Sequence, residues 1–156
     1  MGKKVSNKAV AVAVLEAALV TPEAGYERAA IKTPYLWPDE VVWQRNWTRA
    51  STFVVYGPSP KRAGEAAIYL CWSAMKRFPQ VSMRPSLLLG AGGAAPATKP
   101  EGSILLPDLA PGLASWVRYE NAVDPASCLA PYLDLLKVAG LPYLARLADE
   151  VDSPSA

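Results

Sequence analysis

The segment that most constrains the fold is Ser59–Phe78, SPKRAGEAAIYLCWSAMKRF, which has the pattern of a long helix. Ser59 is a typical N-cap, and Pro60 suits the first helical position, where a missing backbone N–H costs nothing. Apolar residues recur at helical spacing and form one stripe, namely Ala63, Ala67, Leu70, Cys71, Ala74 and Phe78. We therefore expect this helix to organise the chain and to end before Pro79.

The opposite face of the predicted helix carries aromatic and charged residues, namely Arg62, Glu65, Tyr69, Trp72 and Lys76. Aromatic side chains among cations on an outward face are typical of a surface that binds a protein or a nucleic acid. The alternative is that another segment of the same chain covers them, because large aromatic side chains are usually buried.

Helical patterns dominate the rest of the chain. They predict helices over residues 8–20, capped by Asn7, from Pro22 to about Ile31, from Pro38 to about Ala50, and over 113–123, 124–139 and 141–151, with Gly140 as a terminator. AVAVAV in the first of these also fits a strand, and Thr52–Tyr56 is a strand or an extended connector. The expected fold is mostly α, an irregular helical domain with short extended segments and a central Gly/Pro-rich arm.

The arm is residues 90–103, GAGGAAPATKPEGS, whose prolines exclude a regular helix. Gly90–Ala95 matches G-x-G-x-x-A, but a dinucleotide site needs that motif to open a helix, so we expect no cofactor. Two apolar triplets flank the arm, Leu87-Leu88-Leu89 and Ile104-Leu105-Leu106. We expect them to be buried on the helical body, with the arm looping between them or reaching over a neighbouring molecule.

Charge divides the chain into a basic and an acidic part. Residues 1–90 hold 12 Lys and Arg against 6 Asp and Glu, and residues 91–156 hold 4 against 8. The expected organisation is one domain, made of a mobile basic tail (1–7), a basic helical part (8–89), the arm (90–103), an acidic helical part (104–151) and a tail (152–156). The basic part is suited to phosphate, or to the acidic part of the same or a neighbouring copy.

The chain contains no histidine. It therefore cannot contain a Ser–His or Cys–His catalytic pair, a zinc site with histidine ligands, or a histidine general base that works at neutral pH. Two scattered cysteines, Cys71 and Cys128, cannot form a structural zinc site and are expected to be buried thiols in a reducing compartment. No run of 18 apolar residues is present, so no membrane partner is expected. We expect no catalysis, no metal and no cofactor.

Candidates for a protein interface or a nucleic-acid site are the cations and aromatics of the basic part. They are Arg45, Arg49, Arg62, Tyr69, Trp72, Lys76, Arg77 and Arg84. Phosphate neutralisation by the cations and stacking of bases on the aromatics would explain a nucleic-acid-binding role. The tryptophan pair Trp43 and Trp47 is instead expected to pack in the core or between subunits.

Residues 8–78 resemble small, uncharacterised helical proteins encoded by phages and prophages. The resemblance is based on Leu15-Glu16-Ala17-Ala18, on Leu36–Val42 followed by Trp43, and on Pro58-Ser59-Pro60 before the expected Ala-rich helix that contains Trp72. In those proteins a C-terminal helix-turn-helix follows, whereas here the Gly/Pro arm and acidic helices are expected in its place. The expected function is a non-catalytic assembly subunit of a virion or head–tail structure that self-associates or binds other assembly proteins. The alternative is a nucleic-acid-binding adaptor of a phage or mobile element. Either would be located in the cytoplasm of a bacterial host or in the virion.

Overall fold

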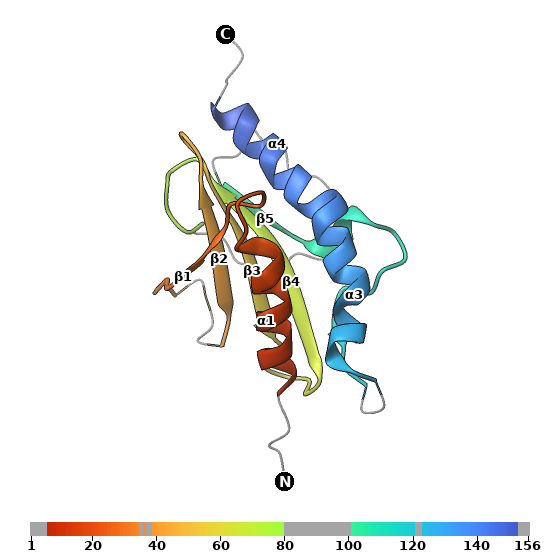
Figure 1. The fold of residues 1–156 in the computed structure, drawn as a ribbon. Coiled ribbons are helices and arrows are strands. Elements are labelled where there is room, and N and C mark those ends of the chain that lie inside the picture. Colours follow the sequence, from red (N-terminus) through yellow and green to blue (C-terminus); the bar gives the residue numbers. More distant parts are fainter. Residues whose placement is uncertain (1–5, 35, 37–38, 80–100, 121–122, 153–156) are drawn as a thin grey trace.

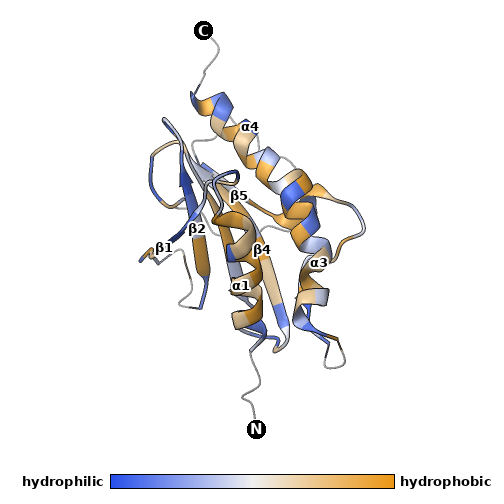
Figure 2. Cartoon of the chain, in the orientation of Figure 1, coloured by the Kyte–Doolittle hydropathy of each residue, from blue (hydrophilic) through white to orange (hydrophobic). Residues whose placement is uncertain are grey.

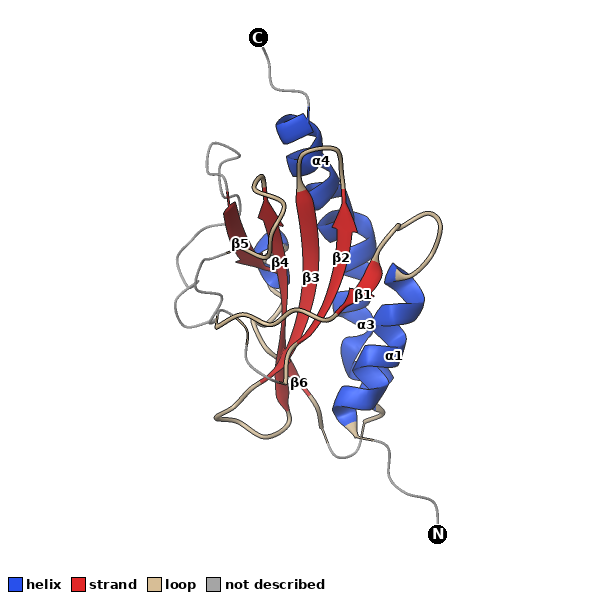
Figure 3. Cartoon of the chain, turned by 90° about the vertical axis from the view of Figure 1, so that its left-hand side faces the viewer, coloured by secondary structure: helices blue, strands red, loops and turns tan. Residues whose placement is uncertain are grey.

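The computed structural model describes residues 6–34, 36, 39–79, 101–120 and 123–152. A six-stranded antiparallel sheet has its helices on one face (Figures 1 and 3). The strands are β1 (Glu27–Ala29), β2 (Val41–Asn46), β3 (Ser51–Pro58), β4 (Glu65–Ser73), β5 (Glu101–Leu105) and β6 (Val117–Arg118). The helical elements are α1 (Asn7–Leu19), the 3-10 turn η1 (Leu106–Leu109), α3 (Pro125–Leu135), the π-helical turn η2 (Leu136–Gly140) and α4 (Leu141–Asp152). The sheet order is β1-β2-β3-β4-β5, and β6 also pairs with β4.

The expected mostly α fold is wrong, because the centre of the chain forms this sheet. The predicted helix Ser59–Phe78 is the β3–β4 loop followed by β4. From Ala66 to Ser73 every residue of β4 is buried, so the strand has no polar alternation. A continuous apolar run of this length has no periodicity that could identify its structure. It fits a strand buried on both faces and a buried helix equally well.

The start signal of that predicted helix has a different use in the structure. The Ser59 hydroxyl accepts hydrogen bonds from the backbone N–H groups of Lys61 (3.3 Å) and Arg62 (3.0 Å), as an N-cap would. These bonds close the β3–β4 loop instead of opening a helix, because Gly64 at φ +80° turns the chain back into β4. A capping residue therefore marks a turn here.

Three further helix predictions are wrong. The segments from Pro22 to Ile31, from Pro38 to Ala50 and over 113–123 contain the strands β1, β2 and β6. Trp43 and Trp47 therefore do not share a helical face, because Trp43 pairs with Val54 across the β2–β3 ladder and Trp47 begins the following turn. Strand pairing decided these segments, and it depends on partner strands that lie outside each predicted helix.

The positions of the other predicted helices and of the predicted strand are confirmed. α1, α3 and α4 lie where helices were expected, and the run Thr52–Tyr56 lies in β3. The cap of α1 is Ser6 rather than Asn7, because the Ser6 side chain accepts from the N–H of Ala9 (3.1 Å).

Gly140 does not terminate a helix, contrary to expectation. The N–H of Leu141 donates to the carbonyl of Leu136, so a π-turn joins α3 to α4. A Cβ atom on Gly140 would lie 3.0 Å from Cδ1 of Leu106 and of Leu136. Glycine at this position therefore allows the helix backbone to pack closely against η1.

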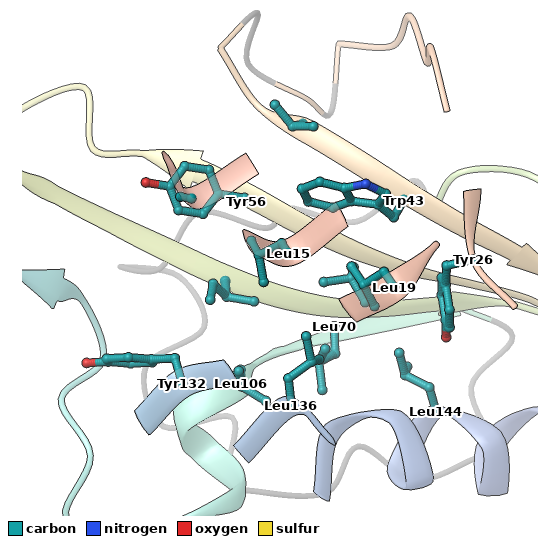
Figure 4. Packing of buried hydrophobic residues seen from close by; sticks show 14 of the residues in the cluster. Leu15, Leu19, Tyr26, Trp43, Tyr56, Leu70, Leu106, Tyr132, Leu136 and Leu144 are labelled. Atoms are coloured by element: carbon teal, nitrogen blue, oxygen red, sulfur yellow. The ribbon is translucent and has the colours of Figure 1, made fainter. Parts of the chain in front are cut away.

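The core has two layers, one on each face of the sheet. Between the sheet and the helices, Leu15 and Leu19 of α1 and Leu144 of α4 pack with Trp43 and Leu70 of the sheet (Figure 4). The opposite face has a second cluster of buried residues, namely Val42, Phe53, Val55, Ala67, Tyr69, Cys71, Phe78 and Leu105. The central strands β3 and β4 are therefore covered on both sides.

The prediction of an arm over residues 90–103 is partly wrong. Its last residues, 101–103, belong to β5, which pairs with β4 from Ser73 to Tyr69. Burial of the triplet Ile104-Leu105-Leu106 is confirmed, with at most 1% of each residue exposed, although the triplet packs within the sheet and η1. Residues 90–100, the triplet Leu87–Leu89 and Arg84 lie outside the described residues.

Position 102 has room only for glycine, because the ring of Trp72, its partner across the β4–β5 ladder, lies directly against it. A Cβ atom on Gly102 would lie 2.3 Å from Cζ2 of Trp72, and that ring is also held edge-on by Tyr143 at 6.4 Å. We predict that Gly102→Ala lowers the free energy of unfolding, measured by urea denaturation, by about 1–3 kcal/mol. Adding Trp72→Phe should cost less than the two single changes together, because a smaller ring makes room for the methyl group. If Gly102→Ala and the natural chain have the same free energy of unfolding within experimental error, this packing is contradicted.

Candidate functional site

The two aromatic residues predicted to stack on bases are not on the surface. Tyr69 and Trp72 are each 1% exposed and lie in different core clusters, on opposite faces of β4. They are three residues apart, and side chains of a strand alternate between faces. Neither ring can therefore bind a nucleic acid in this fold.

The predicted cations are divided between the two ends of the sheet. Arg45 and Arg49 flank the β2–β3 turn, and Lys76 and Arg77 follow β4 at the same end, because Ser51 pairs with Ser73. Arg62 lies in the β3–β4 loop at the other end, one strand length or about 25–30 Å away. The structure therefore brings Arg45, Arg49, Lys76 and Arg77 to one end of the sheet and leaves Arg62 apart from them.

The basic and acidic parts contact each other within the chain. The guanidinium of Arg77 lies 2.9 Å from the carboxylate of Glu101, and Arg118 lies 3.2 Å from Glu65. Asp152, at the end of α4, binds the β2–β3 turn. Of these contacts, only the Arg77–Glu101 pair neutralises a cation of residues 1–90 with an acid of residues 91–156.

The β2–β3 turn holds the Asp152 carboxylate with two successive backbone N–H groups. The N–H of Thr48 donates to Oδ2 (3.1 Å) and the N–H of Arg49 donates to Oδ1 (2.6 Å). The turn itself is closed by a bond from the Trp47 N–H to the Ala50 carbonyl (2.8 Å). Successive N–H groups directed at one point make a concave site for an anion. We call this arrangement the turn site.

A network of polar groups fixes the strands that carry the turn site. The guanidinium of Arg45 lies 3.9 Å above the Trp47 ring and donates to the Ala24 carbonyl (2.9 Å). The Trp47 indole N–H donates to the Thr52 hydroxyl (2.9 Å), which also bonds the Tyr26 hydroxyl (2.7 Å). The turn is therefore linked to the connection between α1 and β1.

A cleft of about 580 Å³ lies between the chain after β1 and the start of β2. Its walls are mostly apolar, with Arg28 and Lys32 as cations and Glu40 as an acid, and its lining residues are Arg28, Ala29, Ala30, Ile31, Lys32, Thr33, Leu36, Glu40, Val41 and Val42. The Arg28 guanidinium is engaged by Glu16 at 3.1 Å. The cleft has the character of a shallow contact surface, and no acid–base pair within it can be assigned.

The outer face of α1 is apolar and exposed. Ala9, Ala13 and Ala17 are exposed at intervals of four residues, and Val20 just beyond the helix is 47% exposed. Figure 2 shows the helix as hydrophobic along most of its length. Its charged residues are Lys8 and Glu16, and Glu16 is bound by the Trp43 indole N–H (3.2 Å). This surface is missing from the sequence-based candidates, although the nearly charge-free run AVAVAVLEAAL indicated it.

The two cysteines lie in different layers of the core. Cys71 is buried in the cluster away from the helices, where burial raises the pKa of its thiol well above the usual value. Cys128, which was also expected to be buried, is only half-buried, and it packs on the helical side. Neither forms a disulfide, and the sheet separates them.

Within the described ranges no cluster of three or more potential metal ligands occurs. In that same part of the chain, none of the helices combines the length and the apolar character needed to cross a membrane.

Comparisons with protein-family models, with curated proteins and with solved structures found no significant match to this chain.

Tyr26, in the network beside the turn site, makes stability depend on alkaline pH. Burial raises its pKa from 10.0 to about 12. Because the unfolded chain loses this proton first, the contribution of Tyr26 is complete below pH 10 and is lost as the pH rises towards 12. Two pKa units correspond to about 2.7 kcal/mol. We predict that the free energy of unfolding falls less steeply between pH 10 and 12 for Tyr26→Phe than for the natural chain. Parallel curves from urea denaturation would contradict this role.

Proposed function

We propose that the chain is a non-catalytic structural subunit that works through protein–protein contacts in a phage virion or head–tail assembly. The observation that carries the proposal is the row of exposed alanines on the outer face of α1, Ala9, Ala13 and Ala17, in a helix whose charged residues are Lys8 and Glu16. Soluble helices with one covered face normally place charged and polar residues on the other, whereas a helix that is apolar on all sides is normally covered on all sides. The sheet and α3 cover only the inner part of α1.

The shape of this face favours another protein element as its cover. Alanines at intervals of four residues leave a smooth surface, on which a second helix can pack at the short end of the usual 8–10 Å interaxial range. No cation of α1 faces outward to meet phosphate, because Lys8 lies at the first turn and is half-buried. An apolar protein surface is therefore the best match.

The size of the face indicates repeated, weak contacts. A helix of 13 residues is about 20 Å long. One such stripe buries less than the roughly 1,000 Å² that a stable isolated interface needs. Contacts of this kind become strong when a subunit makes several of them at once, as in an assembly.

The resemblance of residues 8–78 to phage and prophage proteins supplies the proposed setting. The nucleic-acid-binding adaptor has less support, because its two stacking residues, Tyr69 and Trp72, are buried. It is kept as an outcome of the experiment below.

We predict that the natural chain self-associates as its concentration rises to the order of 100 µM, and that Ala13→Glu abolishes this association. Glutamate costs little helix propensity but places a charge in the middle of the outer face. Ala130→Glu, at an exposed alanine of α3, is the matched control and should associate like the natural chain. Analytical ultracentrifugation measures the association, and circular dichroism checks the fold.

Two outcomes would overturn the proposal. One is a natural chain that stays monomeric throughout and binds none of the proteins from purified virions. The other is equal association of the natural chain and Ala13→Glu. Salt-sensitive binding of labelled DNA at about 50 mM salt, together with a monomeric chain, would favour the adaptor instead.

A further inference from the structure

The geometry points to a second binding surface: the turn site is a carboxylate-binding site that Asp152 fills in the free chain and that an acidic side chain of a neighbouring protein subunit takes over on assembly. This inference rests on the proposed function, because it names a contact that the assembly would use. The turn site is at the end of the sheet, and its residues Thr48 and Arg49 are exposed.

The presence of Asp152 shows that the site accepts a carboxylate. Each carboxylate oxygen receives one backbone N–H, from Thr48 at 3.1 Å and from Arg49 at 2.6 Å. Hydrogen bonds from N–H groups to an ionised acceptor are stronger than those between neutral groups. A backbone site of this kind is fixed by the hairpin itself and does not depend on Asp152 for its shape.

Asp152 lies beyond the buried contacts that hold α4 on the sheet, and the turn site is its recorded hydrogen-bond partner. The buried residues that hold this helix on the sheet are Tyr143, Leu144, Leu147 and Ala148. Asp152 is one turn beyond the last of them, at the end of the helix, where helices fray. Its release therefore leaves the core contacts of α4 in place.

The surroundings of the turn site favour an acidic protein segment. Arg49 is exposed beside it, Lys76 is exposed at the same end of the sheet, and Arg45 is held over Trp47. A partner with two or more carboxylates can therefore bind the turn and meet these cations together. The planar, two-point geometry seen with Asp152 matches a carboxylate directly.

The experiment compares Asp152→Ala with Asp149→Ala, which removes an exposed acid from the same helix and leaves the turn site filled. The probe is a tetra-aspartate peptide, and the readout is the NMR shift of the Thr48 and Arg49 amides. We expect Asp152→Ala to bind the peptide at least about tenfold more tightly than Asp149→Ala or the natural chain, since an attached carboxylate competes at millimolar effective concentration. Asp152→Asn should bind more weakly than Asp152→Ala, because its amide oxygen still accepts a bond.

The inference is overturned if Asp152→Ala, folded by urea denaturation, shows no shift of these amides up to about 50 mM peptide. It is also overturned if all variants respond equally, or if an oligothymidylate of the same charge binds the site more tightly than the peptide. Ultracentrifugation of the natural chain separates this failure from that of the proposed function. If the natural chain self-associates but Asp152→Ala does not bind the peptide, only the carboxylate-binding inference is overturned.

Discussion

Burial of β4 on both faces is the constraint on which the rest of the structure depends. The strand pairs with β3 from Ala66 to Ser73 and with β5 and β6 on its other edge. Its side chains alternate between two clusters, so Ile68, Leu70 and Trp72 need the helices while Tyr69 and Cys71 need cover on the opposite face. The packing of α1, α3 and α4 on one side and of Phe78 and Leu36 on the other follows from this single strand.

The same strand explains which parts of the fold could be predicted from the sequence. α1, α3 and α4 were predictable because their formation depends on local helix propensity and turn residues. β4 was not, because EAAIYLCWS contains no polar alternation and its decisive contact, Gly102 beneath Trp72, lies 30 residues further along the chain. The site prediction failed for the same reason. Helical stepping placed Tyr69 and Trp72 on one outward face, whereas a strand places them on opposite, buried faces.

The charge asymmetry of the sequence was real, but it did not identify a surface by itself. Arg77 and Asp152 are both satisfied by groups from the other part of the chain, so the two parts hold each other together. The more informative signal was the absence of charge. AVAVAVLEAAL has one acid, Glu16, and the structure uses it beneath Trp43 and beside Arg28. The outer side of α1 is left with alanine and valine, which is uncommon for a helix that faces water.

The apolar face of α1 and the turn site are joined by the short connection after α1. Arg45 donates to the Ala24 carbonyl in this connection, and Tyr26 at its end bonds Thr52 at the start of β3. A rigid link of this kind fixes the distance between an apolar stripe and a carboxylate-binding turn. Interfaces commonly combine an apolar centre, which supplies affinity, with charged groups that fix register and exclude wrong partners. A single partner with an apolar helix and an acidic end would bind both the outer face of α1 and the turn site. The distance between these two surfaces would then fix the position of the partner helix along α1.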